Sequence, residues 1–141
     1  LTDVTGVQTC ALPICKFVWK DGQAVAFLTI EPVTPGHVLV IPRKEIDHWE
    51  QIDTATFTHL SDVAQKVGRA VKDAFDAPRM GMLIAGLEVP HVHLHVFPAL
   101  SMETFDLSKA AKDVTQETLE EHAVKIRQSL VDHGYRENVP D

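Results

Sequence analysis

The chain has 141 residues, of which 45% are apolar and 23% charged, a composition typical of one soluble globular domain. Thirteen Lys and Arg against twenty Asp and Glu give a formal net charge of −7, which argues against a nucleic-acid scaffold or a protein that binds anionic membranes. No apolar run is long enough to cross a bilayer, and two cysteines cannot staple a small secreted fold. The composition therefore favours a cytoplasmic protein.

The first fifteen residues differ from the rest of the chain. They contain one charged residue, Asp3, and their apolar residues follow no regular period. The eleven residues from Val4 to Ile14 match the conceptual translation of a common DNA sequencing adapter, and Cys15 fits the codon at its junction. We therefore expect residues 1–15 to be non-native and residues 16–141 to form a single domain whose own N-terminal residues are missing.

The first three predicted strands lie close together in the chain. Apolar, β-forming runs at 16–19 and 23–30 flank the turn signal Lys20-Asp21-Gly22 and predict a hairpin. Two prolines then interrupt the pattern, because proline cannot donate a backbone hydrogen bond. A third strand is predicted over 37–42, and it carries His37 on one face.

A long helix follows. It is predicted from its N-cap Asp53 to about Phe75, with one apolar stripe at three- and four-residue spacing. Two further strands are predicted over 80–85 and 91–97, and a last helix runs from about Thr115 to His133. Short links between the first strands favour antiparallel pairing, so the order of elements predicts an α+β fold.

Three of the eight histidines alternate in the run His91-Val92-His93-Leu94-His95. Alternate residues of a strand face the same side, so this spacing predicts a row of three imidazoles with apolar residues behind it. Such a row is costly to bury unless each ring has hydrogen-bond partners, which argues against a purely structural role. The spacing alone leaves two functions open. The rings ligate a metal such as zinc together with a distant third ligand, or they act as nucleophile and proton carriers at phosphorus.

The run from His91 to Phe97 resembles the His-φ-His-φ-His-φ-φ signature of the histidine triad (HIT) family, in which φ is apolar. Residues 26–30 and 32–42 are similar to the strand–turn–strand unit that precedes the long helix in this family, and 86–90 is similar to a bacterial branch of it. The resemblance spans about Val18 to Pro98, over half of the chain. It implies a five-stranded antiparallel sheet with a long helix and a C-terminal helix, usually paired into a homodimer.

The family transfers or hydrolyses nucleoside monophosphate groups at the α-phosphorus. The resemblance therefore implies that His93 forms a nucleotidyl-histidine intermediate and that His95 contacts the phosphate oxygens and helps the leaving group. It also implies that His91 orients the nucleophile and that His37 supports the site. A hydrolase similar to purine nucleoside phosphoramidases is the first expectation. The alternatives are a dinucleoside polyphosphate hydrolase and a nucleotide-binding signalling module with little turnover.

Five further positions are expected to bind substrate because they match contact positions of the family. Thr29 and Ile30 fall at the nucleoside, and Thr29 replaces an acidic residue that commonly holds the ribose hydroxyls. Gly86, Leu87 and Glu88 fall near the phosphate or its leaving group, where a glutamine and a small hydroxyl residue are common. A glutamate there repels phosphate unless it is protonated, paired or turned away. Glu88 is therefore interpreted as a ligand of an amine leaving group, an acid–base group or a solvent-facing residue.

The reaction that the resemblance implies requires no cofactor and no catalytic metal. Some members hold a structural zinc through an N-terminal Cys-x-x-Cys, a motif that the spacing of Cys10 and Cys15 does not match. We expect a nucleotide substrate, a homodimer, and neither nucleic-acid nor membrane partners. Weaker signals are read as Phe17 or Trp19 in a purine pocket, Trp49 in packing, and three histidines at the surface: His59, His122 and His133.

Overall fold

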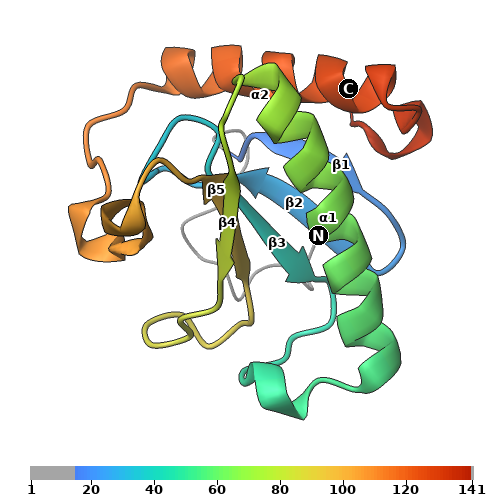
Figure 1. Ribbon diagram of the computed structural model, residues 1–141. Coiled ribbons are helices and arrows are strands. Elements are labelled where there is room, and N and C mark those ends of the chain that lie inside the picture. Colours follow the sequence, from blue (N-terminus) through green and yellow to red (C-terminus); the bar gives the residue numbers. More distant parts are fainter. Residues whose placement is uncertain (1–14, 141) are drawn as a thin grey trace.

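The computed structural model describes residues 15–140. Five strands form one antiparallel sheet in the order β1-β2-β3-β5-β4 (Figure 1). Their bounds are β1 Phe17–Lys20, β2 Ala24–Leu28, β3 Val38–Pro42, β4 Met80–Leu83 and β5 Leu94–Pro98. The predicted α+β class and the hairpin of the first two strands are confirmed. The expectation of a non-native N-terminus falls on residues 1–14, which lie outside the described residues, and on Cys15.

Two helices complete the fold, α1 at Thr54–Ala74 and α2 at Gln116–Asp132. The predicted N-caps are confirmed, since the side chain of Asp53 accepts a hydrogen bond from a backbone N–H of α1 and Thr115 does the same for α2. Figure 1 shows α1 lying along the sheet and α2 crossing near the C-terminal end of α1. No helix within residues 15–140 is long and apolar enough to cross a membrane.

The main core lies between the helices and one face of the sheet. Alternate residues of each strand face this side, as the pleat of a strand requires. Fully buried core residues come from both layers: Val18, Ala24, Ala26, Val38, Val40, Leu94, Leu60, Val67, Leu119 and Ile126. Each such valine, leucine or isoleucine contributes about 1.5–3 kcal/mol relative to an exposed position.

The opposite face of the sheet carries a second apolar cluster and leads to the histidines. The cluster consists of Cys15, Phe17, Val25, Phe27, Leu39 and Ile41. Phe17 pairs with Phe27, Phe27 pairs with Leu39, and Leu39 pairs with His95 across the central strands. Because directly paired residues face the same side of a sheet, His95 lies in the same row, between Leu39 of β3 and Leu83 of β4.

The strand predicted over 91–97 begins later than expected, at Leu94. The backbone N–H of Val92 donates to the carbonyl of Ile46 at 2.7 Å, and that of His91 donates to the carbonyl of Val89 at 2.8 Å. Because this stretch hydrogen-bonds to loops, His91 and His93 precede the strand. The prediction that all three imidazoles form a row on one strand is therefore wrong.

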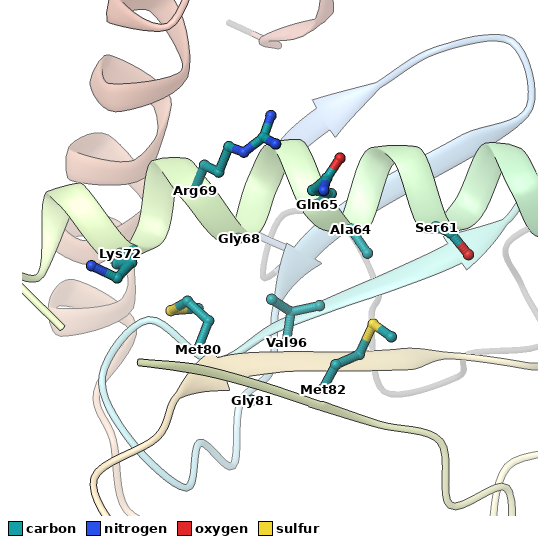
Figure 2. Close-up of a pocket in the computed structure, with 10 residues that line it drawn as sticks. All are labelled: Ser61, Ala64, Gln65, Gly68, Arg69, Lys72, Met80, Gly81, Met82 and Val96. Atoms are coloured by element: carbon teal, nitrogen blue, oxygen red, sulfur yellow. The ribbon is translucent and has the colours of Figure 1, made fainter. Parts of the chain in front are cut away.

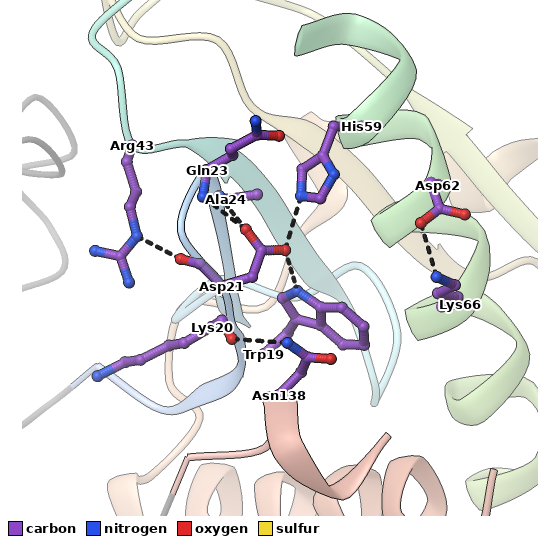
Figure 3. A network of polar contacts seen from close by, with 10 residues as sticks. All are labelled: Trp19, Lys20, Asp21, Gln23, Ala24, Arg43, His59, Asp62, Lys66 and Asn138. Carbon is purple, nitrogen blue, oxygen red and sulfur yellow. Dashed lines mark hydrogen bonds and ion pairs between the residues drawn. The ribbon is translucent and has the colours of Figure 1, made fainter. Parts of the chain in front are cut away.

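The turn between β1 and β2 is held by Asp21 (Figure 3). Its carboxylate accepts from the indole N–H of Trp19 and from His59 Nε2, each at 2.8 Å, and from the backbone N–H groups of Gln23 and Ala24. Burial raises the pKa of Asp21, but these hydrogen bonds outweigh it and leave that pKa below its usual value.

The structure corrects the expectations for three side chains, of which Trp19 and His59 belong to this network. Trp19 is buried in the core between sheet and helices, so it does not line a purine pocket. His59 is half-buried because it bonds to Asp21, and His122 is half-buried against the ring of Phe75, whereas His133 is exposed as expected.

Candidate active site

Three of the four candidate catalytic histidines lie together beside the central strands. His37 immediately precedes β3, His95 lies in β5, and these strands are neighbours. His37 Nε2 and His95 Nδ1 are 2.9 Å apart, and the ring centroids of His93 and His95 are separated by 4.9 Å. His91 lies apart from this ring cluster, because its Nε2 hydrogen-bonds at 2.8 Å to the carbonyl of Pro42 at the end of β3.

The hydrogen bonds assign the tautomers of His37 and His95. The backbone N–H of Val33 donates to His37 Nδ1 at 3.0 Å, so that nitrogen carries no proton. The proton of neutral His37 then lies on Nε2 and is donated to His95 Nδ1. Neutral His95 must therefore carry its own proton on Nε2. That nitrogen is buried and has no hydrogen-bond partner among the described residues, so it offers a donor to a ligand.

Burial keeps this pair of rings neutral. It lowers the pKa of His37 to about 3, and charge repulsion from His95 and His93 contributes in the same direction. Burial likewise lowers the pKa of His95 to about 4, with a further contribution from His93. Both rings are neutral at pH 7, which is the state that the tautomer assignment requires.

His93 is oriented by the backbone. Its Nδ1 lies 2.8 Å from the carbonyl oxygen of His91, which can only accept, so Nδ1 carries the proton. The lone pair of neutral His93 is therefore on Nε2, and the ring is only half-buried. His91 donates its own Nε2 proton to Pro42, which leaves His91 Nδ1 as a buried acceptor without a partner among the described residues.

A pocket of about 510 Å³ opens beside His93 and His95. Thr29, Gly86 and Glu88 line it, as does Leu87, whose residue is 91% exposed. Ile30 is absent from the lining, although it was expected to bind substrate, and 36% of its surface is exposed. Phe17 lies in the second apolar cluster, and Trp49 packs only partly, with its ring against Phe57 and 51% of its surface exposed.

The pocket also has a wall that the sequence did not predict. The segment between β5 and α2 contributes four residues to the lining: Leu107, Ser108, Ala110 and Lys112. Glu31 lines the same pocket. This segment matches no motif. Its nearest sequence signal is Asp106, which caps the short 3₁₀ helix at Leu107–Lys109 through the N–H of Ser108.

Within residues 15–140 no group of three or more His, Cys, Asp or Glu side chains is arranged to hold an ion. Both ring nitrogens of His37 and one of His95 are occupied by the hydrogen bonds from Val33 and between the rings. The histidine cluster of this chain therefore presents one proton donor and one lone pair to the pocket.

The fold and the site define a class of antiparallel α+β proteins in which main-chain groups orient a cluster of histidines through hydrogen bonds. The model of the HIT domain matches residues 14–102. An uncharacterized HIT-like protein from Borreliella burgdorferi is 30% identical over 127 residues, which cover 84% of this chain and 91% of that protein. The chain therefore belongs to the HIT family.

Two further comparisons fit this membership. The asymmetrical bis(5'-nucleosyl)-tetraphosphatase of Schizosaccharomyces pombe is 34% identical over 85 residues, which are 57% of this chain and 47% of that protein. The chain thus spans about half the length of that relative. The structure of a hypothetical histidine triad nucleotide-binding protein from Sulfolobus tokodaii superposes with a TM-score of 0.77 at 28% identity, over 94% of this chain and 93% of that one. These relatives include a bacterium, a fission yeast and an archaeon, and they do not single out a bacterial branch.

Proposed function

We propose that this protein is a nucleotidyl hydrolase or transferase that acts at the α-phosphorus of a nucleoside phosphoramidate or a related nucleotide. A covalent nucleotidyl intermediate on His93 carries the reaction. The observation that supports this most strongly is the pair of tautomers in one pocket. The Nε2 lone pair of His93 and the unpartnered Nε2–H of His95 are the nucleophile and the donor that such a transfer needs.

In the proposed reaction His93 Nε2 attacks the phosphorus, and the bond to the leaving group breaks on the opposite side. His95 Nε2–H hydrogen-bonds to a phosphate oxygen and stabilises the charge that develops there. The carbonyl of His91 holds the Nδ1 proton of His93 and so favours the positive charge on the substituted ring. An amine leaving group takes its proton from solvent in the open pocket. Water then attacks the phosphorus of the intermediate, the bond between phosphorus and Nε2 breaks, the proton of the water passes to solvent, and neutral His93 is regenerated.

The substrate contacts follow the same scheme. The Thr29 hydroxyl lines the pocket and already accepts from the N–H of Glu31 at 3.2 Å, so its own proton is available to the nucleoside. Gly86, Leu87 and Glu88 lie toward the phosphate and its leaving group. Ile30 does not line the pocket, so it would contact the nucleoside only where the nucleoside extends beyond the pocket.

Two other functions stay as candidates. The relative from fission yeast is named for a dinucleoside polyphosphate, which favours hydrolysis of such a nucleotide as the second candidate. A nucleotide-binding signalling module with little turnover is the third. A signalling module predicts that the native chain has very low turnover and that replacing His93 changes this turnover little.

A homodimer is part of the proposal. β4 pairs only with β5 among the described strands, so its outer edge can pair with the same edge of a second copy around a symmetry axis. Beside this edge a pocket of about 340 Å³ lies between α1 and β4, and Figure 2 shows Met80 and Met82 extending toward the helix there. Met82 is 53% exposed and apolar. Light scattering should give a dimer mass for the native chain and a monomer mass for Met82→Glu, and a monomeric native chain would exclude this interface.

The experiment that tests the reaction is hydrolysis of adenosine 5′-phosphoramidate in the presence of excess EDTA. We expect turnover that EDTA leaves intact, and a loss of at least about a thousandfold in kcat for His93→Ala. His133→Ala is the matched control, since His133 is exposed and bonds to Asp73 away from the pocket. Binding of adenosine monophosphate, measured by calorimetry, should survive in His93→Ala.

Each alternative outcome has a meaning. Turnover that a chelator abolishes reversibly would overturn the histidine mechanism in favour of a metal. Equal turnover by the native chain and His93→Ala would exclude His93 as the nucleophile. Nucleotide binding without turnover in either chain would favour the signalling module.

A further inference from the structure

The wall formed by the segment between β5 and α2 is fixed in place beside the histidines. The backbone N–H of Ala111 donates to the carbonyl of Pro32 at 2.9 Å, which ties the segment to the loop between β2 and β3. The same loop is bound to the end of β5, because Thr34 Oγ1 donates to the carbonyl of Pro98 at 2.8 Å. The side chain of Lys112, next to Ala111, is therefore presented to the pocket from an anchored backbone.

The charges along the pocket are unequal. Among the described residues that line it, Lys112 is the one lysine or arginine, whereas Glu31 and Glu88 are both carboxylates. His95 is neutral, as shown above, and its N–H can serve a single phosphate oxygen. A substrate phosphate beyond the first therefore meets one full positive charge in this pocket, on Lys112.

Lys112 is also free to change partner. Its ammonium lies 3.7 Å from a carboxylate oxygen of Glu31, and the two side chains are 71% and 52% exposed. Exposed ion pairs of this kind contribute little, typically less than about 1 kcal/mol. A phosphate that enters the pocket can therefore replace Glu31 at Lys112 at little cost, because its anionic oxygen accepts the same charge-assisted hydrogen bond from the ammonium.

We propose that Lys112 determines specificity for the substrate by binding a phosphate bonded to the α-phosphate, with Glu31 as the competing internal anion. The ligand class is a nucleotide with two or more consecutive phosphates. This inference rests on the proposed function, because it assigns the α-phosphate to His93 and His95. It places a determinant of substrate choice in a segment outside the histidine motif.

The test compares two substrates of different charge, diadenosine tetraphosphate and adenosine 5′-phosphoramidate, and uses the ratio of their kcat/KM values. Lys112→Ala should lower the ratio of tetraphosphate to phosphoramidate by about tenfold, and Glu31→Gln should raise it, because the competing carboxylate is gone. Lys109→Ala is the matched control. Lys109 lies in the same segment and does not line the pocket, so its ratio should equal that of the native chain.

A salt titration separates this role from a structural one. The native ratio should fall as salt screens the contact with Lys112, and the ratio of Lys112→Ala should respond less. An unchanged ratio in Lys112→Ala would overturn the proposal. Where that unchanged ratio comes with equal losses for both substrates, it would indicate a role of Lys112 in the fold of the wall.

The contact between Lys112 and a second phosphate can also be measured without turnover. If the native chain turns over neither substrate, calorimetry with adenosine diphosphate and adenosine monophosphate still measures the contact. Lys112→Ala should then lose about tenfold of the preference for the diphosphate, whereas Lys109→Ala keeps it. An unchanged preference in Lys112→Ala overturns the assignment of Lys112 whatever the catalytic result.

Discussion

The histidines of this site differ in what each ring nitrogen contacts, and these contacts determine what each ring offers. A backbone N–H fixes the proton of His37 on Nε2, and that proton fixes the proton of His95 on its outer nitrogen. A backbone carbonyl fixes the proton of His93 on Nδ1 and leaves its outer nitrogen with a lone pair. The nucleophile is thus set by the main-chain carbonyl of 91, whereas the donor is set by the main-chain N–H of 33 acting through the side chain of His37.

This chain of hydrogen bonds predicts that His37 acts through His95. His37→Phe should lower kcat for the phosphoramidate by about a hundredfold, because His95 Nδ1 loses its donor and the proton of His95 is no longer held toward the pocket. His37→Gln should recover part of that loss, since its amide N–H can donate to His95. Steady-state kinetics of both variants provide the measurement, and equal kcat values for His37→Phe and the native chain would contradict the relay.

The wall of the pocket depends on a close approach between β4 and the segment after β5 that only glycine permits. A Cβ on Gly81 of β4 would lie 2.6 Å from the ring of Phe105 and 2.9 Å from that of Phe97. Phe105 belongs to the 3₁₀ helix Met102–Phe105, at the start of the segment that carries Lys112. The contact between the rings of Phe105 and Phe97 therefore helps to seat this segment on the sheet.

Gly81→Ala should consequently destabilise the protein by about 1–3 kcal/mol, the usual cost of overpacking. Gly22→Ala is the control, because a Cβ there meets no atom within 4 Å. Urea unfolding followed by fluorescence measures both. A Gly81→Ala variant as stable as Gly22→Ala would show that the rings of Phe97 and Phe105 can move aside without loss.

Sequence predicts those elements whose signals are local, and it misses those that depend on contacts between distant segments. The hairpin and both helices were predictable because turn residues, N-caps and apolar periods are local signals. The placement of His91 was not, since it depends on hydrogen bonds from 91–92 to loops. The wall at 107–112 has no local pattern at all, and a tie between Ala111 and Pro32, far apart in the chain, brings it to the site.

For the whole molecule, the buried rings of His37 and His95 link the site to stability. They are neutral in the folded state, with pKa values of about 3 and about 4, against 6.5 when they are free in solution. As pH falls below 6.5, the unfolded chain takes up protons that the folded chain does not bind. The contribution of these two rings to the free energy of unfolding is therefore fully present above about pH 7. It is lost as pH falls toward the folded pKa values.

The size of this loss gives a test that needs no substrate. At about pH 5.5, one unit below the unfolded value, each ring costs about 1.4 kcal/mol, so the pair costs about 3 kcal/mol relative to about pH 7.5. His37→Phe removes one of the two titrating rings, and the difference in unfolding free energy between these pH values should shrink by about 1.4 kcal/mol. His133→Gln leaves both buried rings in place and should keep the native pH dependence. If His37→Phe also keeps it, His37 takes up its proton in the folded state, and the neutral relay from His37 to His95 does not hold.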